Sequence, residues 1–353
     1  MLKIGIIGQG RSGRNIHAKA LHRPNVSEQF EIAAVCDLIP ERCKETCEEN
    51  PGCKAYTDYH AMLKEMNFDL VINATPNEQH PKVTIDILNA GFNCVCEKPM
   101  AYTAADADAM LETAKKNGKF FTVFQEAHYS PAFRRLMDVI KSGKLGRIVM
   151  AKVYFDCFGR RWDWQTLQCK EAGELSNTGP HPLDQALEIY GDADPEHVVC
   201  FMDRANSFGD ADDHVKLLLA GKGHPTIDFE VSRCSAYTPF VYQLFGTNGG
   251  LTGGHDALKW KYFDPAEAPK QKVVFEPLPN RAYCGEPIRF YEESWTGACD
   301  YTNDYMGEKF YQDLYNALVN GGKMMISAAV VRRQIKIIEE CHRQNPFPKK
   351  FQG

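Results

Sequence analysis

A glycine-rich turn directly after the first apolar segment constrains the fold of this chain more than any other feature. Residues Lys3–Ile7 form a short apolar run, and the sequence then continues as Gly8-Gln9-Gly10-Arg11-Ser12-Gly13. Between a strand and a helix, glycines at this spacing allow a tight turn, close approach of the backbone to a pyrophosphate, and close helix–strand packing. The free N–H groups at the start of the helix also attract phosphate. The motif predicts a dinucleotide site whose contacts include Gly8, Gly10, Arg11, Ser12 and Gly13.

The segment up to residue 123 repeats this strand-then-helix order, which is typical of a doubly wound parallel sheet covered by helices. We therefore expect a Rossmann domain over residues 1–123. Its helices are predicted to end before Pro24 and at Gly91, to begin at Pro40, and to run over Ala104–Asn117 before Gly118. The predicted strands are Lys3–Ile7, Glu31–Cys36, Leu70–Ala74, Asn93–Glu97 and Phe120–Phe124, with a weak strand near Ala55.

Asp37 stands just after the second predicted strand and indicates which dinucleotide is bound. A carboxylate at this position accepts hydrogen bonds from the ribose hydroxyls and repels a 2′-phosphate. The sequence thus favours NAD over NADP. Arg11 and Arg42 weaken this preference, because an arginine nearby can accommodate the phosphate.

Composition excludes several other classes of protein. The formal net charge is −5 at pH 7 with Lys and Arg scattered along the chain, so no basic patch indicates nucleic-acid binding. No apolar run approaches the roughly 20 residues that span a bilayer, and the first residues are too short and glycine-rich for a signal peptide. The 13 cysteines include no C-x-x-C pair and are odd in number, which fits a metal site or a disulfide framework poorly. We expect reduced thiols in a soluble cytoplasmic protein without a metal.

Two further motifs follow predicted strands, where ligands of open α/β sheets bind. One is Ala74-Thr75-Pro76-Asn77, with His80 shortly after it, and the other is Glu97-Lys98-Pro99. Together with the glycine turn, these segments resemble the Gfo/Idh/MocA family, named for glucose–fructose oxidoreductase, inositol dehydrogenase and rhizopine-catabolism proteins. The resemblance is close over residues 1–150 and looser beyond, where it includes Ser142-Gly143-Lys144-Leu145-Gly146.

The resemblance implies a nicotinamide cofactor and a central role for Lys98. In the family, the lysine of Glu-Lys-Pro contacts nicotinamide and substrate, and the Lys-Pro peptide is commonly cis; we carry both over to Lys98 and Pro99. Beside the cationic ring of an oxidised nicotinamide, this lysine should have a lowered pKa and can polarise a hydroxyl or relay its proton. His80 either reaches the same cleft or only bonds to backbone at a helix start. The other expected cofactor contacts are Glu97, Thr75, Pro76 and Asn77.

From residue 124 to 353, the pattern changes to that of an α+β substrate-binding domain with an open, mainly antiparallel sheet. Ile227, Phe229 and Val231 alternate with polar residues, which predicts one apolar and one polar face. The exposed face is a natural self-association surface, and family members often pair through it, so we expect a homodimer or homotetramer. The predicted elements are the strands Ile148–Cys157, His197–Arg204, Val215–Ala220 and Thr226–Cys234 and the helices Phe310–Val319 and Ser327–Arg343.

Residues 173–184 carry the second set of candidate catalytic residues. They resemble the family segment in which an aspartate, a histidine four residues later and an aspartate three beyond that face the nicotinamide. His181 matches the histidine, and Asp184 the last carboxylate, which either binds substrate or orients its helix. Asn177 stands where many members have the first aspartate. Because an amide cannot take up a proton, Asn177 can only orient a group, and His181 becomes the expected base, with Lys98 as orienter or relay.

A loop just upstream, Gly159-Arg160-Arg161-Trp162-Asp163-Trp164-Gln165, is dense in aromatic and hydrogen-bonding side chains. Indole faces stack on the C–H faces of sugars, and such residues in a loop favour a binding role, although large aromatics are more often core. We therefore expect Arg161, Trp162 and Trp164 to contact a carbohydrate-like substrate. Gln125, His128 and Tyr129 lie at the predicted domain junction, a common place for a cleft, and are further candidates.

These residues lead to one preferred function and two alternatives. We expect NAD-dependent oxidation of a secondary alcohol in a sugar, an inositol or a glycoside, in the last case at C3, with proton removal by His181. The first alternative is redox-neutral glycoside cleavage, in which one bound NAD oxidises and then re-reduces the substrate without release of NADH. The second is a nucleotide-binding regulator that has lost catalysis, as Asn177 would then signal.

Overall fold

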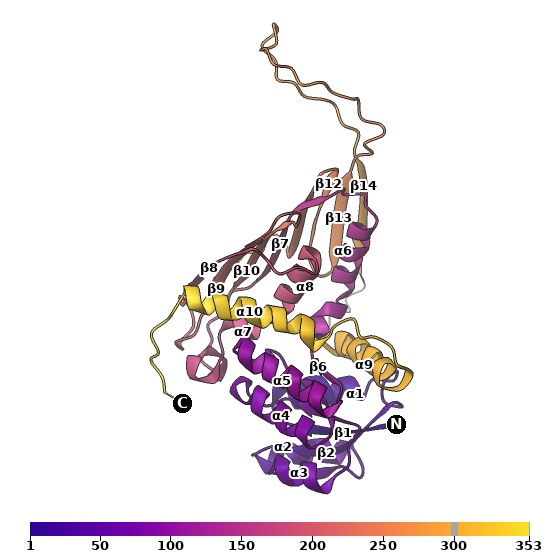
Figure 1. The fold of residues 1–353 in the computed structure, drawn as a ribbon, viewed down its shortest axis with the longest axis vertical. Helices are drawn as coiled ribbons and strands as arrows, with labels where there is room; N and C mark the ends of the chain where they lie inside the picture. Colours follow the sequence, from indigo (N-terminus) through magenta and orange to yellow (C-terminus); the bar gives the residue numbers. More distant parts are fainter. Residues whose placement is uncertain (298–302, 353) are drawn as a thin grey trace.

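The computed structural model describes residues 1–297 and 303–352, which form two sheets joined by a layer of helices (Figure 1). The first sheet is entirely parallel and has the strand order β3-β2-β1-β4-β5-β6. This order reverses direction at β1, so the carboxyl ends of β1 and β4 flank a crevice. The prediction of a doubly wound Rossmann sheet is confirmed. The strands are β1 (Leu2–Ile7), β2 (Phe30–Cys36), β3 (Lys54–Tyr56), β4 (Leu70–Asn73), β5 (Asn93–Cys96) and β6 (Phe121–Val123).

Helices cover both faces of this sheet and begin and end at residues suited to those positions. Helix α5 (Ala104–Asn117) starts after Thr103, whose side chain accepts a hydrogen bond from the N–H of Asp106, and ends at Gly118 with φ of 60°. This is the predicted range, because glycine tolerates the left-handed conformation that closes a helix. The other helical segments are η1 (Gly13–Ala18, a π-helix), α1 (Lys19–Leu21), α2 (Pro40–Glu49), α3 (Tyr59–Glu65), η2 (Asn77–Gln79) and α4 (His80–Asn89).

The second sheet has eight strands in the order β14-β13-β12-β11-β7-β10-β9-β8. Strands β7 and β10 run parallel, and the other described pairs are antiparallel, as the predicted mainly antiparallel sheet requires. Ile227, Phe229 and Val231 are fully buried on one face, as their alternation predicts. The strands are β7 (Ile148–Asp156), β8 (His197–Asp203), β9 (His214–Ala220), β10 (Thr226–Ser232), β11 (Tyr242–Gly246), β12 (Gly249–Gly253), β13 (Ala257–Tyr262) and β14 (Tyr291–Thr296).

Helices fill the space between the second sheet and the first domain. Helix α8 (Pro180–Tyr190) packs on β7 and β10, and α9 (Asn303–Asn320) returns to the first domain, where Phe310, Tyr311 and Leu314 join a buried cluster with Ile4 and Ile6. The remaining helical segments are η3 (Glu126–Tyr129), α6 (Pro131–Lys141), η4 (Trp164–Thr166), η5 (Gln168–Lys170), α7 (Glu174–Asn177) and α10 (Ala328–Gln344).

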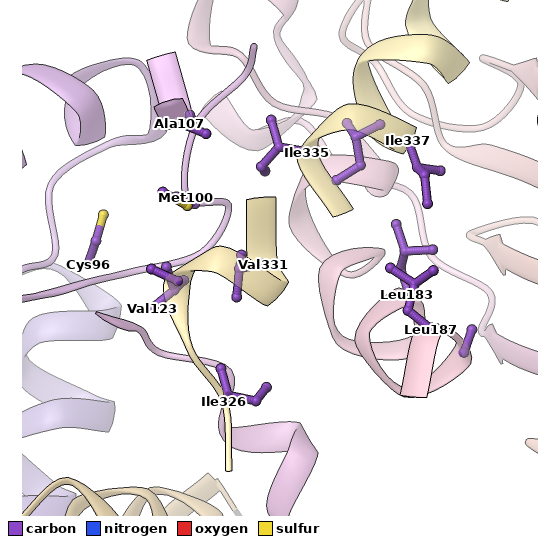
Figure 2. Packing of buried hydrophobic residues seen from close by; sticks show 14 of the residues in the cluster. Cys96, Met100, Ala107, Val123, Leu183, Leu187, Ile326, Val331, Ile335 and Ile337 are labelled. Atoms are coloured by element: carbon purple, nitrogen blue, oxygen red, sulfur yellow. The ribbon is translucent and has the colours of Figure 1, made fainter. Parts of the chain in front are cut away.

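Helix α10 lies across the junction of the two domains and packs on both (Figure 1). It contacts α5 and β6 of the first domain and α8 and β8 of the second. Figure 2 shows Val331 and Ile335 of α10 between Met100 and Ala107 on one side and Leu183 of α8 on the other. One continuous apolar cluster therefore holds the domains together. Arg332 adds a bidentate ion pair to Asp108 of α5.

Residues 263–290, between β13 and β14, form a long excursion that extends away from the sheet (Figure 1). It carries exposed apolar side chains, including Phe275 and Tyr283.

Each cysteine within the described residues is a free thiol. Over the same residues, none of the helices has the length and apolar character that crossing a membrane requires.

Candidate active site

A cleft of about 510 Å³ lies at the carboxyl ends of the first sheet, where it meets the second domain. The structure brings most of the predicted site residues together here. From the first domain, the lining contains Gly8, Gly10, Arg11, Ser12, Asp37, Thr75, Pro76, Asn77, His80, Glu97 and Lys98. From the second domain, it contains Arg161, Trp164, Asn177 and His181 among the predicted residues.

The three glycines of the turn fit a bound dinucleotide for different reasons. Gly8 has φ of +93°, and a Cβ there would lie 2.3 Å from the carbonyl oxygen of Ala74. Gly13 does not line the cleft; a Cβ there would lie 1.9 Å from the carbonyl oxygen of Gly8, so it is needed for close packing of the turn. A Cβ on Gly10 would have no atom of the described residues within 4 Å, so the space beside Gly10 on the cleft wall is open. Such a cradle suits a pyrophosphate at close range.

Asp37 is fixed at the tip of β2 by backbone donors. Its carboxylate accepts hydrogen bonds from the N–H groups of Gln9 (2.7 Å) and Ile39 (2.9 Å). The guanidinium of Arg42, one of the two arginines that weaken the prediction of NAD, lies 3.7 Å from the same carboxylate. A carboxylate has about four acceptor sites, and two of them remain for ribose hydroxyls.

His80 and Asn77 tie backbone segments together at the edge of the cleft. The His80 ring is buried, with Nδ1 2.7 Å from the carbonyl oxygen of Pro99 and Nε2 2.8 Å from that of Thr75. The Asn77 amide donates to the carbonyl oxygen of Glu171 in the second domain at 3.1 Å. His80 thus bonds to backbone, as one of its two predicted roles requires, and holds the segment that follows Lys98.

Glu97 is a buried carboxylate beneath Lys98 with two protein contacts. One oxygen lies 3.2 Å from Nε2 of His17, and the other accepts a hydrogen bond from the N–H of Lys98 at 3.0 Å. Burial alone would raise the pKa of Glu97, but the bond from His17 and the charge of Lys98 lower it to about 2. Nδ1 of His17 lies 2.6 Å from the hydroxyl of Tyr311 in α9. Glu97 is therefore a fixed anion whose partners are protein groups.

Lys98 and His181 face the same part of the cleft from opposite domains. The Lys98–Pro99 peptide is cis, as the family resemblance implies, and Nζ of Lys98 donates to the backbone carbonyl oxygen of Asn177 at 2.7 Å. Burial and the charge of Lys98 lower the pKa of His181 to about 3, so the imidazole is neutral at pH 7. Asn177 thus acts on Lys98 through its backbone carbonyl.

Glu126, which the sequence reasoning did not single out, also lines this part of the cleft. Its Oε1 lies 3.9 Å from Nε2 of His181. Burial and the neighbouring charge of Glu97 raise its pKa to about 8, against the opposing charge of Lys98. A signal was available, because Glu126 follows β6, and strand ends supplied the other first-domain candidates.

The loop that contains Trp162 and Trp164 lies partly in the cleft and partly at the surface. Trp164 lines the cleft, as do Arg161, Asp163 and Gln165, whereas Trp162 is 80% exposed and lies outside the described lining. The Arg161 guanidinium is paired with Asp163 at 2.7 Å. The second-domain part of the lining also includes Thr178 and Arg233, which were not predicted.

Four of the predicted substrate contacts lie together outside the described lining of the cleft. Nδ1 of His128 is 2.7 Å from Asp184, which also accepts a hydrogen bond from Gln334 of α10 at 2.9 Å. Gln125 donates to the same Gln334 at 2.9 Å, and the Tyr129 hydroxyl donates to Asp313 at 2.6 Å. These bonds hold α8 against η3 and α10 and occupy most polar atoms of this buried cluster, although Oε1 of Gln125 has no partner among the described residues.

Comparison with known proteins agrees with this arrangement. Residues 2–125 match the oxidoreductase family with an NAD-binding Rossmann fold, and residues 133–252 match the GFO/IDH/MocA C-terminal domain. Inositol 2-dehydrogenase of Salmonella typhimurium is 34% identical over 186 residues, which cover 52% of this chain and 53% of that protein. D-glucoside 3-dehydrogenase of Escherichia coli is 29% identical over 193 residues, 54% of each chain. The match spans about half the length of these relatives.

The fold also recurs across almost the whole chain in solved structures. An oxidoreductase from Agrobacterium radiobacter, crystallised in complex with NAD+, L-tartaric acid and magnesium, superposes with a TM-score of 0.75 at 20% sequence identity. The superposition covers 99% of this chain and 98% of that one. Because both halves match domains of one family, the chain belongs to the Gfo/Idh/MocA oxidoreductase family, and its N-terminal domain is an NAD(P)-binding Rossmann domain.

Proposed function

We propose that this protein is an NAD-dependent dehydrogenase that oxidises a secondary alcohol of a sugar, glycoside or inositol. The observation that carries the proposal is the position of Lys98 and His181, which line one cleft together with the glycine turn. A nicotinamide bound in that cleft would supply the acceptor for the hydride that leaves the alcohol carbon. The protein's part is then to orient the alcohol and to manage its proton.

Lys98 and His181 divide this work in the proposed mechanism. The Lys98 ammonium, held by the Asn177 carbonyl, donates a hydrogen bond to the substrate oxygen and stabilises negative charge that develops on it. The neutral imidazole of His181 accepts the hydroxyl proton. Asn177 is a positioning residue in this scheme.

The preference for NAD over NADP rests on Asp37. Its carboxylate is anchored at the end of β2 and lines the cleft, so a 2′-phosphate would meet a fixed negative charge. Arg42 partly offsets this repulsion, since its guanidinium lies 3.7 Å away. We therefore expect discrimination against NADP without full exclusion.

A polyol or sugar ring suits the second-domain wall. Trp164 offers an aromatic face, and Arg161, Asp163, Gln165, Thr178 and Arg233 offer donors and acceptors for several hydroxyls. The names of the two relatives, inositol 2-dehydrogenase and D-glucoside 3-dehydrogenase, support the same substrate class. Oxidation of a glucoside at C3 is the more specific form of this proposal.

Self-association through the second sheet is part of the proposal. Its outer face exposes Phe201, Leu218 and Phe245 from three different strands. Apolar side chains spread over one sheet face favour an isologous contact with a second copy. We infer a homodimer or homotetramer.

A substrate screen with NADH absorbance as the readout tests the function directly. The protein is incubated with NAD and, separately, with inositols, hexoses, uronates and glucosides, and then with NADP in place of NAD. We expect NADH to accumulate with at least one polyol, which would also exclude redox-neutral glycoside cleavage. The absence of NADH with every substrate class, together with measurable NADH binding, would contradict the proposal and favour a regulator.

A further inference from the structure

Glu126 presents a buried carboxyl group to the cleft. It lies in η3, directly after the Rossmann sheet ends, and is only 5% exposed. Its Oε2 has no hydrogen-bond partner among the described residues, and neither has Nδ1 of His181. Buried polar atoms are normally partnered, so these two side chains have hydrogen-bonding capacity that no described residue uses.

The spacing between Glu126 and His181 suits one hydroxyl group. Their Oε1 and Nε2 atoms are 3.9 Å apart, which is too far for a direct hydrogen bond. An oxygen atom about 2.8 Å from each of them would bridge this gap. A substrate hydroxyl that approaches His181 would therefore also contact the carboxyl group of Glu126.

The other nearby groups are poorly suited to keep the proton that this hydroxyl loses. Asn177 cannot take up a proton, and Nζ of Lys98 already donates a hydrogen bond to the Asn177 carbonyl. His181 becomes cationic only against its own burial and the charge of Lys98. Glu97 is held as an anion by His17. This leaves Glu126.

The charges that face Glu126 come from two elements. Glu97 and Lys98 approach from the end of β5, and the neutral ring of His181 approaches from α8. Burial and Glu97 favour the protonated carboxyl, Lys98 favours the carboxylate, and the resulting pKa is about 8. The group therefore changes charge close to physiological pH, which is what an acid–base catalyst requires.

We propose that Glu126 is a catalytic acid–base residue, which contacts the reacting hydroxyl beside His181 and holds its proton when the alcohol has been oxidised. This inference rests on the proposed dehydrogenase function. The O–H bond breaks and its proton passes through His181 to the Glu126 carboxylate. The C–H bond breaks with its electron pair passing to the oxidised nicotinamide, and the C=O bond forms. In the reverse direction, protonated Glu126 returns the proton to the carbonyl oxygen.

The pH dependence follows from which form of Glu126 acts in each direction. Oxidation needs the carboxylate, whose fraction increases as the pH rises through about 8, so kcat/KM should increase up to that pH and then level off. Reduction of the ketone needs the protonated form and should decline over the same range. Glu126→Gln should lower kcat/KM about 100-fold and abolish both trends. Glu126→Asp should keep a pH-dependent rate.

The experiment combines these pH profiles with infrared difference spectra of the protein without cofactor. Burial also raises the pKa values of Asp156 and Asp212 to about 7, so carboxyl C=O bands from these groups should appear in both proteins. Wild-type protein should show an additional C=O band that disappears near pH 8, and Glu126→Gln should lack this additional band. Glu112→Gln is the matched control, because Glu112 is an exposed carboxylate of α5 outside the described lining. NADH fluorescence verifies that each variant is folded.

The possible outcomes separate this inference from the proposed function. Absence of the infrared band from wild-type protein, or wild-type rate and pH profile in Glu126→Gln, would overturn the role of Glu126. If no polyol is oxidised by wild-type protein, the dehydrogenase function fails, and Glu126 with it. If a polyol is oxidised and only Glu126→Gln is unaffected, the function stands and the role of Glu126 does not.

Discussion

The two walls of the cleft are built in different ways. The first-domain wall consists of strand ends and tight turns, where Gly8, Asp37 and Lys98 are fixed by the geometry of a parallel sheet. The second-domain wall consists of a loop and short helices, where Arg161 is paired with Asp163 and the same Asp163 side chain caps the short helix that begins at Trp164. A wall made of backbone can recognise what is constant, the dinucleotide, whereas a wall made of side chains can change its substrate with few substitutions.

Removing the groups that meet between the walls should have the largest effect. Lys98→Ala and His181→Ala should each lower kcat about 100- to 10,000-fold, because one loses the charge at the substrate oxygen and the other loses the proton acceptor. The double variant should be little worse than either single variant, since the two residues act as a unit. Steady-state kinetics with the best polyol measures this.

Additive losses in that double variant would show that the walls act independently. Lys82→Ala is the matched control, because Lys82 lies on the surface of α4 and bonds to Asp86. It should retain wild-type kinetics.

Two glycine substitutions separate packing from cofactor binding within the first wall. Gly13→Ala forces a Cβ to within 1.9 Å of a backbone oxygen and should lower the free energy of unfolding by about 1–3 kcal/mol or more. Gly10→Ala meets no described atom, so its stability should stay within about 0.5 kcal/mol of wild type, while NADH binding weakens about tenfold. Thermal unfolding measures the change in stability, and NADH fluorescence measures the change in NADH affinity. Equal loss of stability in both variants would contradict this division of roles.

Asp37→Ala tests the basis of cofactor choice. Loss of charged hydrogen bonds to the ribose should weaken NAD binding about tenfold, and loss of repulsion should improve NADP binding. The ratio of kcat/KM for the two cofactors measures the change. An unchanged ratio would mean that Arg11 or Arg42, and not Asp37, decides the preference.

The smallest effect is expected on the second wall, from Trp164→Ala. Loss of the aromatic face should raise KM for the polyol about three- to tenfold and leave NADH binding unchanged. Trp162→Ala is the matched control, because Trp162 is 80% exposed and lies outside the described lining. The same KM increase in both variants would mean that the loop acts as a whole and not through Trp164.

The same contrast between the walls explains how far sequence reasoning reached. The first sheet and most of its helices were predictable, because strand, glycine and helix follow one another within a few residues. Strands β11 to β14 were not predicted. Glycines at 249, 250, 253 and 254 interrupt the apolar pattern around β12, where pairing with β11 and β13 stabilises the strand. Strand β13 does alternate, with Leu258 and Trp260 buried between exposed lysines, and could have been predicted. Local pattern carries little information about such long-range pairing.

The second wall was less predictable for a related reason. Gln125 and Glu126 are adjacent, yet only Glu126 faces the cleft, while Gln125 bonds to Gln334 more than 200 positions away. Which neighbour faces inward depends on how η3 turns and on where α10 lies. Arg233 reaches the cleft only because β10 pairs with β7. The position after β6 makes Glu126 a candidate, but no short motif encodes which of the two neighbours faces the cleft or how Arg233 reaches it.

The position of α10 affects how substrate and product can enter and leave the cleft. Swinging the domains apart would pull Val331 and Ile335 away from one side of their shared cluster and break the pair between Arg332 and Asp108. Exposing apolar surface costs about 25 cal/mol per Å², so such a hinge motion is strongly disfavoured. We therefore expect the two halves to behave as one rigid body during turnover. Substrate and product would then enter and leave through a cleft entrance that stays open, and domain closure would not limit the reaction rate.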